Sequence, residues 1–94
     1  WAQHDTGAAS MALVLQAQGL GLVAHQMGGF DTAKLRTVFS IPEQYTPMAM
    51  IAVGYQAEAD ILEGDFKARE LAPRARKTME SRFFEGTWGA AVNK

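Results

Sequence analysis

Residues 22–31 read LVAHQMGGFD, a short apolar segment followed by two glycines, a phenylalanine and an aspartate. The apolar part is suited to a buried strand, and Asp31 can cap the helix that follows it. Adjacent glycines between a strand and a helix let the backbone approach a flat or anionic ligand without an intervening side chain. Two glycines before a helix are also ordinary turn chemistry, and the glycine spacings of dinucleotide-binding and phosphate-binding loops are absent. Taken alone, this stretch predicts a strand, a turn and a helix start, but no particular ligand.

The sequence on either side of the glycine turn predicts two helices and a second strand. A helix is expected over residues 5–20, because small and apolar residues recur at spacings of three and four after a possible cap at Asp5 or Thr6. These residues cover more than one face, which predicts packing on both sides of the helix. A second helix is expected over 32–40. The nearly unbroken apolarity of 47–55 predicts a strand that is covered on both faces.

Residues 58–94 are predicted to form a polar helix and a basic tail. Residues 1–66 contain two basic and seven acidic side chains, whereas residues 67–94 contain seven basic and three acidic ones. Arg74 and Arg76 follow a proline, and in an extended segment both side chains project to the same side, where they could clamp a phosphate. A solvated basic surface is the alternative interpretation of this pair.

Composition excludes several classes of function. The chain is 48% hydrophobic and 20% charged, with a formal net charge of -1, which is typical of a soluble globular protein. It has no cysteine, so a redox function would depend on a bound cofactor, and two histidines are too few for a metal site. The most apolar run, residues 48–53, is too short to span a bilayer. A slightly negative charge, without aromatic residues interleaved among the basic ones, argues against nucleic-acid binding.

Six short motifs occur in the order seen in the carboxyl-terminal half of FMN-dependent nitroreductases. They are Asp5–Ala9, Gly19–Leu22, Met27–Asp31, Ile41–Glu43, Val53–Tyr55 and Pro73–Arg76. Each motif is weak alone, but six at compatible spacings cover nearly the whole chain. Residues 1–94 therefore resemble the carboxyl-terminal part of a single nitroreductase-like domain.

The resemblance implies an α+β fold in which helices wrap a mixed sheet and two copies form an intertwined homodimer with FMN at the subunit interface. Enzymes of this family take hydride from NADH or NADPH onto the flavin and pass it to nitroaromatics, quinones or related small-molecule acceptors. The cofactor performs this chemistry, and the protein binds, orients and tunes it. We expect a cytoplasmic protein without membrane or nucleic-acid partners.

The resemblance implies six FMN-binding residues, which are Gln26, Met27, Gly28, Gly29, Arg74 and Arg76. The glycine pair, Gly28 and Gly29, matches a turn whose backbone amides face the isoalloxazine near N5, with the two preceding residues leading into it along one side of the ring. The arginine pair, Arg74 and Arg76, matches the residues that bind the FMN phosphate. The family often has an acidic residue where Gly28 stands, so tuning of the flavin by a side chain at this position is in doubt. No catalytic side chain and no metal ligand is assigned.

The family's amino-terminal Arg-x-Ser-x-Arg motif, which supplies the remaining phosphate and ribityl contacts, does not occur in this sequence. The chain begins at Trp1 and a helical pattern follows almost at once, as expected of a piece cut from a longer protein. We therefore expect part of an FMN site here, with weak or no FMN binding by the chain alone. A truncated, non-catalytic module for dimerisation or ligand sensing is the alternative.

Overall fold

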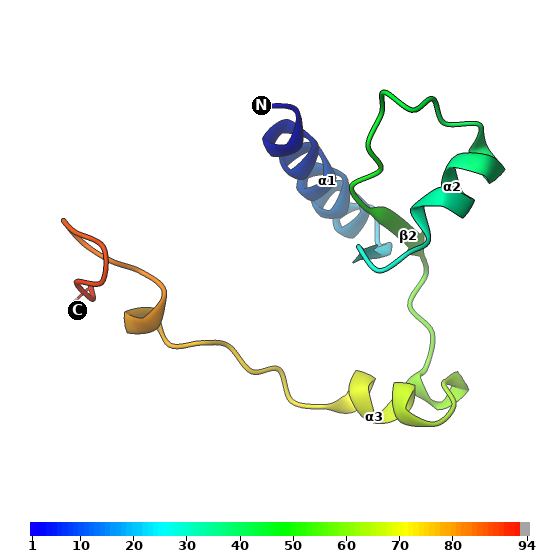
Figure 1. Cartoon of the computed structure of the whole chain (residues 1–94). Helices are drawn as coiled ribbons and strands as arrows, with labels where there is room; N and C mark the ends of the chain where they lie inside the picture. Colours follow the sequence, from blue (N-terminus) through cyan, green and yellow to red (C-terminus); the bar gives the residue numbers. More distant parts are fainter. Residues whose placement is uncertain (93–94) are drawn as a thin grey trace. The chain divides into compact units, whose positions relative to one another are not determined.

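The computed structural model describes residues 1–92 and divides the chain into two compact units, Trp1–Ala57 and Glu58–Lys94. The elements of the first unit, drawn from blue to green in Figure 1, are α1 (Ala2–Gly19), β1 (Val23–Met27), α2 (Thr32–Phe39) and β2 (Met50–Gly54). Those of the second unit are the 3-10 turn η1 (Ala59–Ile61), α3 (Asp65–Leu71) and the 3-10 turn η2 (Met79–Ser81). Helices combined with an antiparallel strand pair confirm the expected α+β class.

Helix α1 begins earlier than its apolar pattern predicts. Its N-cap is Trp1, without a side-chain cap, so the expected cap at Asp5 or Thr6 is wrong. The hydroxyl of Thr6 donates instead to the carbonyl of Ala2 at 2.7 Å, which satisfies it inside the helix. The Asp5 carboxylate lies 3.4 Å from the ring Nδ1 of His4.

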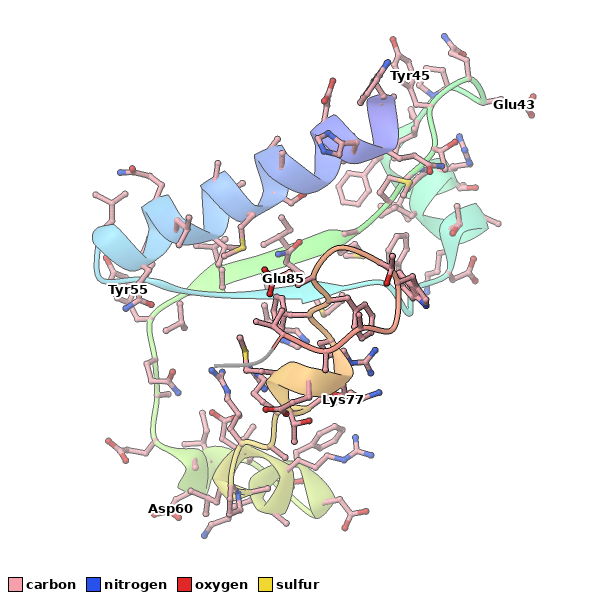
Figure 2. All side chains as sticks on the ribbon, turned by 90° about the vertical axis from the view of Figure 1, so that its left-hand side faces the viewer. Glu43, Tyr45, Tyr55, Asp60, Lys77 and Glu85 are labelled. Carbon is pink, nitrogen blue, oxygen red and sulfur yellow. The ribbon has the colours of Figure 1, made fainter. Side chains whose placement is uncertain are left out.

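The end of α1 is a glycine-dependent reversal. The N–H of Leu22 donates to the carbonyl of Ala17 at 2.9 Å, and the N–H of Gly21 donates to that of Gln18 at 3.1 Å. This pair of bonds is the Schellman arrangement, which needs a left-handed residue, and Gly21 has φ +77. The reversal sends the chain straight into β1, so that α1 lies along one face of the strand pair (Figure 2).

Strands β1 and β2 pair antiparallel, with Val23 opposite Gly54 and Met27 opposite Met50. Within the strand and glycine turn expected over 22–31, the strand is Val23–Met27, and β2 is shorter than the strand expected over 47–55. The chain thus contributes two neighbouring antiparallel strands to the sheet implied by the resemblance. It does not itself cover β2 on both faces as expected, since the side chain of Val53 is 49% exposed.

Much of the apolar surface in the first unit is uncovered. Ala17, where α1 meets the strands, is the one buried hydrophobic residue among residues 1–92. Leu13 lies one turn before it and lines a shallow apolar groove with Leu22 and Val53. Leu15, two residues further on and therefore on the opposite side of the helix, is 61% exposed. Within residues 1–57, one of the two packing faces predicted for α1 is covered, by the strand pair.

The second unit is built from short pieces. Gly64, with φ +56, is the N-cap residue of α3, so the polar helix expected in this region starts only after it. An ion pair of 2.6 Å between Lys67 Nζ and the Asp60 carboxylate joins α3 to η1. Residues 73–78 carry no helix or strand, as expected for an extended basic segment.

Residues 83–92 fold back on themselves, which the sequence patterns did not predict. The N–H of Glu85 donates to the carbonyl of Ala90 at 2.9 Å across the reversal. Two residues inside it have left-handed backbones, Gly86 at φ +76 and Gly89 at φ +87. Two glycines three residues apart are the signal that could have indicated this turn.

Candidate functional site

The glycine pair links β1 to α2 and is anchored at both ends. On the strand side, Met27 is paired with Met50 across the ladder. On the helix side, the Asp31 carboxylate accepts a hydrogen bond of 2.9 Å from the N–H of Lys34, so Asp31 is the N-cap that the sequence predicts. The turn is therefore held by one cross-strand pair and one helix cap.

The backbone of the turn is open. Neither Gly28 nor Gly29 has a left-handed φ, and a Cβ added to either would meet no atom of the chain within 4 Å. Every other glycine of the chain has similar space, so space alone does not assign a ligand. The N–H groups of the pair take part in none of the backbone hydrogen bonds that close turns and helix ends within residues 1–92. They are thus two main-chain donors without a backbone partner in the described part of the chain.

Gln26 and Met27 lead into this turn as the last two residues of β1. Successive side chains of a strand point to opposite faces, so these two lie on different faces of the sheet. Gln26 is exposed, whereas Met27 is half-buried. An isoalloxazine ring on one face of the sheet would therefore contact the side chain of only one of these two residues. That both lead into the turn along one side of the ring stays a prediction.

The arginine pair lies in the second unit, on the segment between α3 and η2. Both side chains are exposed, and Arg76 Nη1 donates only to the carbonyl of the adjacent Ala75, at 3.0 Å. Neither arginine forms an ion pair with the described residues. Their guanidinium groups are therefore available for an anion. The structure brings Gln26 through Gly29 together, and it describes the arginine pair in a separate unit.

Two hollows in the first unit are lined by residues other than the glycine pair. One, of about 360 Å³, lies between the first turns of α1 and the loop before β2, where Figure 2 labels Tyr45. Its lining residues are Ala2, Gln3, Thr6, Gln44, Tyr45, Thr46 and Met48. A shallower, apolar groove along α2 begins with Phe30 and Asp31, immediately after the glycine pair, and ends at Met50.

The described residues meet neither the requirements of a metal site nor those of a membrane-spanning helix. Within residues 1–92, no three or more histidine, aspartate or glutamate side chains come together as metal ligands. None of the helices described has both the length and the apolar character needed to cross a membrane.

Arg36 is a residue that the sequence patterns did not single out. From α2, its guanidinium donates to the carbonyls of Pro42 and Tyr45 in the loop that leads to β2. The contacts are with main-chain oxygens, which every residue carries, so no spacing or residue type in the sequence signals them.

Comparison with known proteins identifies the family of this chain, which the geometry of the site alone does not. The family model described as "Nitroreductase family" matches residues 1–55, which is almost the whole of the first unit. An uncharacterised 15.4 kDa protein in the ask 5′ region of Mycolicibacterium smegmatis is 34% identical over 89 residues, which are 95% of this chain and 60% of that protein.

A crystal structure of an oxidoreductase containing FMN superposes with a TM-score of 0.84 at 33% identity, over 93% of this chain and 43% of that one. This chain thus spans less than two thirds of the length of either relative. Both alignments extend well beyond residue 55, so they also include most of the second unit. The matched family model, together with the α+β architecture, establishes that this chain belongs to the nitroreductase family.

Proposed function

We propose that the protein is an FMN-dependent oxidoreductase of the nitroreductase type, which takes hydride from NADH or NADPH and passes it to nitroaromatic, quinone or related acceptors. The observation that carries this proposal is the close superposition, over 93% of the chain, on an oxidoreductase that contains FMN. Because the chain spans 43% of that neighbour, the activity is proposed for the whole protein and not for residues 1–94 alone.

The residues present fit a flavin mononucleotide in their donor chemistry. The glycine pair offers main-chain N–H groups in an open turn, suited to a flat ring that becomes negatively charged near N5 on reduction. The arginine pair offers guanidinium forks, the groups best matched to a phosphate. FMN, when bound, supplies the hydride chemistry, and these residues would bind and orient it.

The arginine pair would discriminate FMN from riboflavin, which lacks the phosphate. A charge-assisted hydrogen bond contributes roughly 1.5–3 kcal/mol, which corresponds to about a 10- to 150-fold change in affinity. We expect Arg74→Gln and Arg76→Gln each to weaken FMN binding by about this factor in the whole protein and to leave riboflavin binding unchanged. Arg69→Gln, at the end of α3, is the matched control, and it should change neither affinity.

Flavin fluorescence during titration measures these affinities, and oxidation of NADH or NADPH with a quinone acceptor measures turnover. An equal loss of FMN and riboflavin affinity in the arginine variants would remove the phosphate role. A whole protein that purifies without flavin and does not acquire it on titration would refute the proposed function itself. The isolated chain should bind FMN weakly or not at all, and sub-micromolar binding would show a more complete site than we propose.

The uncovered apolar surface supports a homodimer. Ala17 is the one buried hydrophobic residue described, while Met11 and Leu15 on the outer side of α1 are 49% and 61% exposed. A soluble protein rarely leaves so much contiguous apolar surface in water. We therefore propose that α1 packs at a subunit interface of a cytoplasmic homodimer. Light scattering that reports a stable, well-folded monomer would contradict this assignment.

One observation favours a second candidate function, a truncated non-catalytic module for dimerisation or ligand sensing. The relative from M. smegmatis has a mass of 15.4 kDa, against 10.2 kDa for this chain, and the chain spans 60% of it. The reading frame upstream of Trp1 distinguishes the two candidates. An Arg-x-Ser-x-Arg motif roughly 100 residues earlier would support the enzyme, and a start codon within a few residues would support the module.

A further inference from the structure

Arg36 clamps the loop that joins α2 to β2. Its Nη1 donates to the carbonyl of Pro42 at 2.9 Å, and its Nη2 donates to the carbonyl of Tyr45. The two acceptors lie three residues apart, so a single planar guanidinium spans the turn between them. A lysine ammonium, which is a compact point donor, could not reproduce this fork.

The backbone of the same loop is closed around this side chain. Ser40 has a left-handed backbone, with φ 51 and ψ 42, which lets the N–H of Ile41 return to the carbonyl of Arg36 at 3.0 Å. The N–H of Tyr45 donates to the carbonyl of Pro42 at 3.1 Å. Arg36 thus holds the loop through both its main chain and its side chain.

Packing does little to hold α2. None of the residues of this helix is buried, and its inward side borders an open apolar groove that reaches Met50. The position of α2 is therefore set by its connections. At its start these are the Asp31 cap and the glycine turn, and at its end they are the contacts of Arg36.

These connections link the glycine pair to the loop that Arg36 holds. Gly28 and Gly29 join β1 to α2, and the loop joins α2 to β2. The two strands are in turn paired with each other at Met27 and Met50, so the glycine pair and the loop lie at the two ends of the same helix. Since neither glycine is held by packing or by a left-handed backbone, the turn takes its shape from the two elements that it joins. If the loop is released at Arg36, α2 is free to move and the turn moves with it.

We propose that Arg36 is a positioning residue for the glycine turn, and that it acts on the flavin site through α2 without touching the ligand. This inference rests on the proposed function only where it concerns flavin. The effect on the turn itself is a property of the chain.

Amide hydrogen exchange of the full chain tests the inference directly. Wild type is compared with Arg36→Gln, which cannot span both carbonyls, and with Arg36→Lys. Lys34→Gln serves as the matched control, because it removes a positive charge from the same helix without a contact to the loop. We expect Arg36→Gln to raise exchange several-fold at the hydrogen-bonded amides of residues 34 and 45, with α1 unchanged. Arg36→Lys should give a smaller rise, and Lys34→Gln none.

The outcomes separate a positioning role from a general structural one. Exchange at residue 34 that stays at the wild-type rate in Arg36→Gln would overturn the inference. So would a uniform rise that includes α1, because that result would show global destabilisation.

In the whole protein, FMN affinity should fall several-fold in Arg36→Gln and stay unchanged in Lys34→Gln. If wild type binds no FMN, the proposed function fails, while the exchange measurement still decides the role of Arg36.

Discussion

The Asp31 cap offers a direct measure of how α2 is held, and Asp31→Ala is the change that removes it. The carboxylate accepts the N–H of Lys34 at 2.9 Å, and no residue of the eight-residue helix is buried. Loss of an N-cap acceptor costs about 1 kcal/mol, within a range of roughly 0.5–2. Little packing is available to offset this loss, so we expect a value in the upper half of that range. For a chain of 94 residues, each loss of about 1 kcal/mol lowers the melting temperature by roughly 4–8 °C, so the expected shift lies in the upper part of this range or above it.

Asp31→Asn separates the hydrogen bond from the charge. Asparagine keeps an acceptor oxygen and loses only the interaction of the carboxylate with the helix dipole, which is worth roughly 0.3–1 kcal/mol and is screened by salt. Urea denaturation followed by circular dichroism should therefore order the free energy of unfolding as wild type, then Asp31→Asn, then Asp31→Ala. The difference between wild type and Asp31→Asn should shrink at high salt. An Asp31→Ala variant as stable as wild type, or equal losses in both variants, would refute the argument that the acceptor oxygen holds the helix.

The same denaturation assay tests two further features. Gly21→Ala should lower the free energy of unfolding by about 1–2 kcal/mol, because φ is +77 there, whereas Gly7→Ala, inside α1, should raise it by roughly 0.5–1 kcal/mol; similar effects of the two changes would contradict the glycine-dependent end of α1. Lys67→Gln should cost less than about 1 kcal/mol, and less still at high salt, because Lys67 and Asp60 are 45% and 83% exposed. A larger, salt-independent loss would show that the pair is more than a surface contact.

Features with a local cause were predictable from the sequence. The helix expected over 32–40 is observed as Thr32–Phe39, with Asp31 as its cap, because an aspartate side chain reaches the N–H three residues on. The end of α1 at its glycines was predictable for the same reason, since the left-handed residue is part of the local chain. The start of α1 was not, because its first turn, Ala2 to Asp5, contains one small apolar residue and therefore no apolar face to announce a helix.

The residues of the candidate site were also predictable only in part. Sequence motifs named the glycine pair and the arginine pair, and the structure describes each of them as exposed and without a competing ion pair within residues 1–92. Gln26 and Met27 lie on different faces because they are successive residues of strand β1, whose side chains alternate between the two faces of the sheet. That these six residues share one cofactor remains a prediction, and the flavin titrations decide it.

The sequence by itself determined the family, the order of the elements and the residue types that suit a flavin, because those depend on side-chain identity and short spacings. Only the tertiary structure revealed how the glycine turn is held. The clamp of Arg36 on the loop before β2 uses the carbonyls of Pro42 and Tyr45, and a main-chain carbonyl is the same in every residue. Contacts of this kind depend on where the backbone goes, so they become visible only when the chain is folded.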